Sequence, residues 1–99
     1  MGGFKANVDL KGKTILVTGV AGFIGSNLAK RLLEIIDGAK VIGIDNLNDY
    51  YEVKIKETRL KELYHFPAFV FVKGSIAEKA TINNIFKTYK PSVVVNLAA

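Results

Sequence analysis

The chain has 99 residues, of which 49% are apolar, so it is long enough for one small domain with a buried core. It contains no cysteine, which excludes disulfides and thiolate metal sites, and no apolar run approaches the ~20 residues that a membrane-spanning helix needs. Its net charge of +5 is scattered among acidic residues and residues 1–10 lack the apolar core of a signal peptide, so we expect a cytoplasmic protein that binds neither nucleic acid nor a membrane.

Short β-branched apolar runs alternate along the chain with stretches of helical periodicity. Residues 1–13 form a polar leader, and the folded domain is expected to occupy residues 14–99. The predicted elements, in chain order, are a strand at 14–18, a helix from about 24 to 36 that ends at Gly38, a strand at 41–45, a helix at 53–63, a strand at 69–72, a helix at 77–89 and a strand at 92–96. Residues 46–51 form a polar loop after the second strand.

The predicted strands are apolar throughout instead of alternating, which indicates that both faces of their sheet are buried. Strands separated by helices favour a parallel sheet with right-handed crossovers and helices on both faces. We therefore predict an α/β fold with a Rossmann-type parallel sheet of strand order 3-2-1-4, which is truncated after the fourth strand. Phe69, Phe71 and Phe86 fall on strand and helix positions that face the core.

A glycine-rich motif lies where the first strand passes into the first helix. Gly19, Gly22 and Gly25 follow a Gly-x-x-Gly-x-x-Gly spacing, a variant of the Gly-x-Gly-x-x-Gly pattern of dinucleotide-binding proteins. Glycine permits the sharp turn, a side chain at Gly22 would block a pyrophosphate, and Gly25 would let the helix pack closely against the sheet. The free amides near Gly22, Phe23 and Ile24 would then face the phosphates, assisted by the helix dipole.

An acidic residue ends the second predicted strand. Asp45 follows Gly25 by 20 residues, and an acid at this position accepts hydrogen bonds from the hydroxyls of the adenosine ribose. Its charge also repels a 2′-phosphate, which favours NAD over NADP. Each feature has a structural alternative, since glycines also serve tight turns and Asp45 can cap a turn with Asn46. Their joint occurrence in the correct strand and helix context favours NAD binding.

Three segments of the chain resemble the extended short-chain dehydrogenase/reductase family. The Thr-Gly-x-x-Gly-Phe-Ile-Gly run at 18–25 is similar to the family's glycine motif, and residues 93–99 are similar to its fourth strand with a Leu-Ala-Ala end. Residues 41–51, above all the Asn-Leu-Asn-Asp-Tyr-Tyr run, resemble nucleotide-sugar 4-epimerases that act on UDP-glucuronate. The likeness covers nearly all of the chain after residue 12.

The resemblance implies which residues hold NAD. Backbone amides of Phe23 and Ile24 would meet the pyrophosphate. Asp45, with Asn46 and Leu47 beside it, would hold the adenosine ribose. The cofactor-binding residues implied in this way are Gly19, Gly22, Phe23, Ile24, Gly25, Asp45, Asn46, Leu47, Ser75, Ile76, Leu97, Ala98 and Ala99.

Two positions depart from the family's pattern. Ser75 replaces an acid in the turn after the third strand, a turn that meets the adenine ring in the family. Asn96 stands where histidine often precedes the Leu-Ala-Ala end, whose three residues would line the cofactor channel.

The resemblance also implies an activity for the whole protein. In the family, the C4 hydroxyl of a UDP-sugar is oxidised to a ketone with NAD, and the hydride returns to the opposite face. A Tyr-x-x-x-Lys pair with a Ser or Thr activates that hydroxyl, and these residues follow the fourth strand. Residues 14–99 are thus expected to be the N-terminal part of the NAD-binding domain of a homodimeric UDP-sugar epimerase, inactive alone. The alternatives are a sugar-nucleotide 4,6-dehydratase or decarboxylase, and a non-catalytic dinucleotide-binding module.

Two further features are interpreted as non-catalytic. Tyr50 and Lys54 have the Tyr-x-x-x-Lys spacing, but they closely follow Asp45 and would lie at the adenosine end, far from the nicotinamide. His65 is the single histidine, so we expect no metal site around it.

Overall fold

The computed structural model describes residues 10–47 and 53–98. Strands and helices alternate along these residues, as the sequence predicts. The elements are β1 (Thr14–Thr18), α1 (Phe23–Ile35), β2 (Lys40–Asp45), α2 (Val53–Leu63), β3 (Phe69–Lys73), α3 (Lys79–Tyr89) and β4 (Val93–Asn96). Residues 1–9 of the predicted leader and 48–51 of the predicted loop lie outside the described residues.

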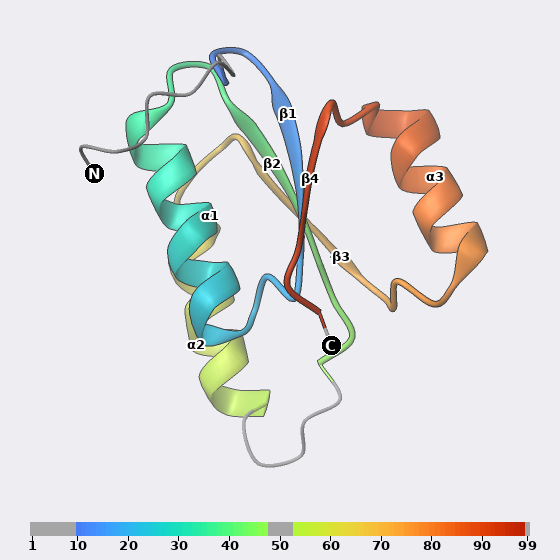
Figure 1. Ribbon diagram of the computed structural model, residues 1–99. Coiled ribbons are helices and arrows are strands. Elements are labelled where there is room, and N and C mark those ends of the chain that lie inside the picture. The colour runs from blue at the N-terminus through green and yellow to red at the C-terminus, as the bar shows by residue number, and fades with distance from the viewer. Residues whose placement is uncertain (1–9, 48–52, 99) are drawn as a thin grey trace.

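The strands form one parallel sheet in the order β3-β2-β1-β4, which confirms the predicted fold class. α1 and α2 cover one face of this sheet and α3 covers the other (Figure 1). In the inner strand β1, Thr18 is in register with Ile44 of β2 and with Asn96 of β4. Because all strands run in one direction, their carboxyl ends meet at one edge, where ligands bind in open parallel sheets.

Two apolar clusters hold the layers together. The larger, on the side of α1 and α2, comprises the buried residues Ile15, Val17, Val20, Ala21, Ala29, Ala39, Val41, Leu60, Leu63 and Phe69. The smaller, on the side of α3, comprises Leu16, Ile42, Ile44 and Ile85. Full burial of one aliphatic side chain stabilises a fold by about 1.5–3 kcal/mol, so these clusters fix how each helix sits on the sheet.

β4 is covered on one face only, which corrects the prediction that every strand is buried on both faces. Val93 and Val95 pack against the larger cluster, whereas Val94 is 50% exposed. The smaller cluster joins α3 to β1, β2 and β3 and contains no residue of β4, so this helix does not cover β4. Although β4 is apolar in sequence, the described residues bury only one of its two faces.

The prediction that Phe86 faces the core is wrong, because 40% of its surface is exposed. Successive helical residues are rotated by about 100°, so the neighbouring Ile85 points into the sheet while Phe86 turns away from it. Ile24 and Ile35, which continue the apolar period at the two ends of α1, are exposed as well. The buried residues of α1 are Gly25, Ser26 and Ala29, while Leu32 and Leu33 are partly buried against the larger cluster.

Two helix ends differ from the predictions because turn hydrogen bonds intervene. α1 has Ile36 as its C-cap, and Gly38, with a φ of +70°, lies in the following turn. α3 begins at residue 79 instead of 77, with Glu78 as its N-cap. The N–H of Ser75 donates to the Glu78 carboxylate at 2.8 Å, which keeps the residues between them in a turn.

Gly25 is the point where α1 approaches the glycine loop most closely. A β-carbon at this position would lie 2.9 Å from the carbonyl carbon of Gly19, 3.0 Å from Cα of Val20, and closer still to the Gly19 carbonyl oxygen. These are backbone atoms, which cannot rotate aside as a side chain can. The prediction that Gly25 permits close packing of the first helix is confirmed for its contact with this loop.

We expect Gly25→Ala to lower the free energy of unfolding by about 1–3 kcal/mol, because the added methyl group forces α1 away from the loop. Urea denaturation followed by circular dichroism measures this change. Arg31→Ala, on the exposed face of the same helix, serves as the control and should change stability by less than about 0.5 kcal/mol. Equal losses in the two variants would contradict the close approach at Gly25.

Candidate functional site

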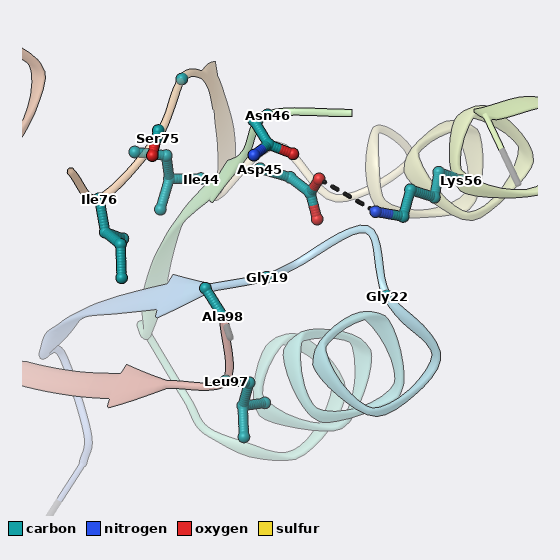
Figure 2. Close-up of a pocket in the computed structure, with 11 residues that line it drawn as sticks. Gly19, Gly22, Ile44, Asp45, Asn46, Lys56, Ser75, Ile76, Leu97 and Ala98 are labelled. Carbon is teal, nitrogen blue, oxygen red and sulfur yellow. Dashed lines mark hydrogen bonds and ion pairs between the residues drawn. The ribbon is translucent and has the colours of Figure 1, made fainter. Parts of the chain in front are cut away.

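A cavity of about 300 Å³ opens at the edge of the sheet where the strands end. Figure 2 shows the residues around it, which come from the glycine loop, the end of β2, α2, the turn after β3 and the segment after β4. Among the predicted cofactor residues, those that line the cavity are Gly19, Gly22, Asp45, Asn46, Ser75, Ile76, Leu97 and Ala98. Gly74, which belongs to the turn predicted to meet adenine, lines the cavity as well. Ile44 and Lys56 also line it and are absent from the sequence prediction.

The other predicted cofactor residues do not line this cavity. Phe23, Ile24 and Gly25 form the first turn of α1, and the side chains of Phe23 and Ile24 are exposed. Leu47 packs against the larger apolar cluster, and Ala99 lies outside the described residues. The predicted contact of Phe23 and Ile24 with a pyrophosphate uses their backbone amides, so exposed side chains are compatible with it.

The glycine loop closes through its own backbone hydrogen bonds. Gly19 has a φ of +69°, which glycine adopts without strain, and its N–H donates to the Ile44 carbonyl at 2.9 Å. The N–H of Gly22 donates to the Gly19 carbonyl at 3.1 Å, so this amide is not one of the free donors that the sequence predicts. The hydrogen bonds of α1 begin with the N–H of Ser26 on the Gly22 carbonyl, which leaves the amides of residues 23–25 at the open end of the helix.

Asp45 ties the end of β2 to the glycine loop. Its side chain is 4% exposed; Oδ2 accepts the N–H of Ala21 at 3.0 Å and Oδ1 accepts the N–H of Leu47 at 2.9 Å. Asp45 therefore does cap a turn, which is the structural alternative to ribose binding. The amide that it accepts is that of Leu47 and not that of Asn46. A carboxylate has about four lone-pair positions, so these two amides leave room for a further donor.

Thr18 holds the segment after β4 against the glycine loop. Its hydroxyl oxygen accepts the N–H of Leu97 at 2.8 Å and that of Ala98 at 3.2 Å, while its O–H donates to Oδ1 of Asn96 at 2.6 Å. A β-carbon on Gly19 would lie 3.1 Å from the Leu97 carbonyl and the Ala98 nitrogen, so the two segments nearly touch. Sequence reasoning missed Thr18, because its partners follow it by almost the whole length of the domain.

Ser75 closes the turn after β3. Its hydroxyl accepts the N–H of Ala77 at 3.1 Å, and the N–H of Gly74 donates to the carbonyl of Asp45 at 3.1 Å. The turn is therefore fixed beside β2 by backbone and hydroxyl contacts. Ile76, at the tip of the turn, is partly exposed on the cavity wall.

α2 directs two cations at the loop and the cavity. Nη1 of Arg59 donates to the Ala21 carbonyl at 3.1 Å, and its guanidinium carbon lies 5.8 Å from the centre of the Phe23 ring. The amine of Lys56 lies 3.5 Å from Oδ1 of Asp45. A signal for Lys56 exists in the sequence, since it precedes the buried Leu60 by four residues and therefore shares the inward face of the helix.

The structure describes two of the three residues interpreted as non-catalytic. Tyr50 lies outside the described residues, and Lys54 and His65 are exposed. Within residues 10–47 and 53–98, no group of three His, Cys, Asp or Glu side chains is placed to hold a metal ion. No helix in this part of the chain is long and apolar enough to cross a membrane.

A parallel sheet of order 3-2-1-4, a glycine loop that opens its first helix and an acid at the end of its second strand define a Rossmann-type nucleotide-binding fold. The sequence profile of the family described as GDP-mannose 4,6 dehydratase matches residues 16–99, and the chain belongs to this family. The resemblance to NAD-dependent epimerases and dehydratases of the short-chain dehydrogenase/reductase type is thereby confirmed.

Characterised relatives include both epimerases and dehydratases. The UDP-glucuronate 4-epimerase of Thermodesulfobacterium geofontis is 46% identical over 84 residues, which are 85% of this chain and 25% of that protein. The crystal structure of UDP-glucuronic acid 4-epimerase from Bacillus cereus with UDP-glucuronic acid and NAD is 32% identical, with a TM-score of 0.74 over 87% of this chain and 26% of that one. The crystal structure of dTDP-glucose 4,6-dehydratase from Bacillus anthracis in complex with NAD is 36% identical, with a TM-score of 0.79 over 88% of this chain and 27% of that one. The chain thus spans about a quarter of the length of the relatives that it matches.

We expect Thr18→Val to lower the free energy of unfolding by about 1–3 kcal/mol, because it removes the hydroxyl that accepts the amides of Leu97 and Ala98. The Leu97 amide keeps the Thr18 carbonyl as an acceptor at 3.3 Å, whereas the Ala98 amide loses this hydroxyl. Urea denaturation measures the loss. Thr14→Val, at the opposite end of the same strand, is the matched control and should have a smaller effect. If both variants were equally stable, the role assigned to the Thr18 hydroxyl would be refuted.

Proposed function

We propose that this chain is the NAD-binding portion of a nucleotide-sugar epimerase that inverts C4 of a UDP-sugar such as UDP-glucuronate. The observation that carries the proposal is the shared cavity, in which the glycine loop and the carboxylate of Asp45 lie together at the carboxyl edge of a parallel sheet. NAD, bound in the Bacillus relatives, is the dinucleotide with which this arrangement is compatible.

The residues of the chain fit the parts of a dinucleotide one by one. The open amides of Phe23 and Ile24 at the N-terminus of α1 suit a pyrophosphate, with the helix dipole in the favourable direction. The remaining acceptor capacity of Asp45 suits the hydroxyls of the adenosine ribose, next to Asn46. Glycines at 19 and 22 leave this wall of the cavity without side chains, so a ligand can reach the backbone.

The two other predicted groups of residues bound the cavity at its ends. The Ser75 and Ile76 turn beside β2 is the proposed contact for adenine. Leu97 and Ala98 after β4, and Ala99 next to them, are the proposed lining of the channel toward the nicotinamide. Bound NAD would supply hydride acceptance and return, while these residues would orient it and exclude water from one side.

The 4-epimerase reaction is favoured over its alternatives by the relatives and by the sequence after β2. UDP-glucuronate 4-epimerases recur among the similar proteins, and the run at 46–51 resembles their sequence. A dTDP-glucose 4,6-dehydratase superposes on this chain with a TM-score as high as that of the epimerase, so a 4,6-dehydratase remains the second candidate. A non-catalytic module is a third candidate, distinguished from the others by turnover of the longer protein.

We expect the 99-residue chain to catalyse no epimerisation of UDP-glucuronate in the presence of NAD, because the proposal places the Tyr-x-x-x-Lys pair and its Ser or Thr outside these residues. Chromatographic separation of UDP-glucuronate and UDP-galacturonate after incubation measures the product. Product formed at a rate above that of a heat-denatured sample would contradict this assignment.

Calorimetric titration of the chain with NAD measures the binding itself. We expect Gly22→Val to weaken NAD binding at least about 100-fold, since the branched side chain would occupy the position of the pyrophosphate and would also crowd the Gly19 carbonyl, 3.2 Å from a β-carbon. Asn83→Val, on the exposed face of α3, is the control and should leave the affinity unchanged. Unchanged affinity in Gly22→Val, with circular dichroism confirming its fold, would refute the proposed phosphate site.

A further inference from the structure

Lys56 is a cation on the cavity wall, and none of the proposed contacts with NAD involves it. It lies one turn before Leu60 on the inward face of α2, and its side chain is 15% exposed. Figure 2 shows its amine directed at the carboxylate of Asp45. A mostly buried lysine requires a compensating charge, which here is the acid at the proposed ribose position.

The contact between the Lys56 amine and the Asp45 carboxylate is longer than the hydrogen bonds that the carboxylate accepts from backbone amides. The amine lies 3.5 Å from Oδ1 of Asp45, whereas that oxygen also accepts the Leu47 amide at 2.9 Å and Oδ2 accepts the Ala21 amide at 3.0 Å. Backbone amides therefore hold the carboxylate firmly, and the amine remains within reach of any other anion beside Asp45. If the adenosine ribose is bound to Asp45, a phosphate on its 2′-position would be an anion of this kind.

We propose that Lys56 is a specificity-determining residue, and that discrimination between NAD and NADP depends on the Asp45–Lys56 pair and not on Asp45 alone. The inference rests on the proposed function, since it assumes that Asp45 faces the adenosine ribose. Asp45 neutralises the amine and repels a 2′-phosphate. When the carboxylate is replaced by a neutral group, the same amine becomes the partner of that phosphate.

A role for the Asp45–Lys56 pair predicts a different NAD and NADP preference in an Asp45 variant than a role for Asp45 alone. If Asp45 acted alone, its neutral replacement would make the affinities for NAD and NADP equal. With Lys56 beside it, the replacement leaves an uncompensated positive charge on the cavity wall, so the preference should reverse toward NADP. The attraction between the amine and a 2′-phosphate is partly screened near a protein surface, so we expect the affinity ratio to reverse by about tenfold.

The experiment measures the affinities for NAD and NADP of the wild-type chain, Asp45→Asn, Lys56→Met and the double variant by calorimetric titration. We expect the wild type to prefer NAD, Asp45→Asn to prefer NADP by about tenfold, and the double variant to show no preference. Lys56→Met alone should raise the NAD-to-NADP affinity ratio several-fold. Lys54→Met removes the same charge from the exposed face of α2 and is the control, expected to leave the ratio unchanged.

The possible failures are distinguishable. If the wild-type chain binds neither NAD nor NADP, the proposed function fails. If the wild type prefers NAD but Asp45→Asn and the double variant bind NADP equally, the role of Lys56 is overturned while NAD binding stands. Should Asp45→Asn not fold by circular dichroism, Lys56→Met decides alone, because an affinity ratio identical to that of Lys54→Met overturns the inference.

Discussion

The hydrogen bond from the Ala21 amide to the Asp45 carboxylate, 3.0 Å long, is the interaction on which the site depends. A carboxylate that is 4% exposed must have donors, and the amides of Ala21 and Leu47 supply them from the two segments that border the cavity. One buried charge thereby joins the glycine loop to β2 and keeps its own orientation. The two hydrogen bonds fix the carboxylate relative to the loop, and groups that are held in place favour affinity because less order has to be imposed on binding.

Around this unit, the parallel sheet assembles residues that are remote in sequence. Thr18 draws in the segment after β4, the turn at Ser75 is attached to the end of β2, and α2 adds Lys56 and Arg59 from the side of the glycine loop. Apart from the Lys56–Asp45 ion pair, each of these contacts involves at least one backbone group, so peptide groups make up much of the site's hydrogen bonding. Such a site suits a ligand whose phosphates and hydroxyls are recognised by hydrogen bonds.

This part of the chain is common to enzymes with different reactions. A UDP-glucuronic acid 4-epimerase and a dTDP-glucose 4,6-dehydratase, both crystallised with NAD, superpose on it with TM-scores of 0.74 and 0.79. Both of these structures contain NAD, so this segment of the fold is found with the same dinucleotide in enzymes of two reaction classes. Under the proposed function, the groups that separate one reaction from the other lie in the part of the relatives that this chain does not span.

The sequence alone determined the alternation of elements, the parallel sheet and the pairing of the glycine loop with Asp45, because these depend on local periodicity and on fixed spacings. Only the tertiary structure decided how each helix is rotated on the sheet. Packing of Ile85 leaves Phe86 exposed, although the helical spacing alone is compatible with either residue facing the core. The spacing from Leu60 places Lys56 on the inward face of α2, but only the fold shows that it reaches the cavity beside Asp45. The Thr18 contacts also required the fold, since hydrogen bonds across nearly 80 residues leave no periodic trace in a sequence.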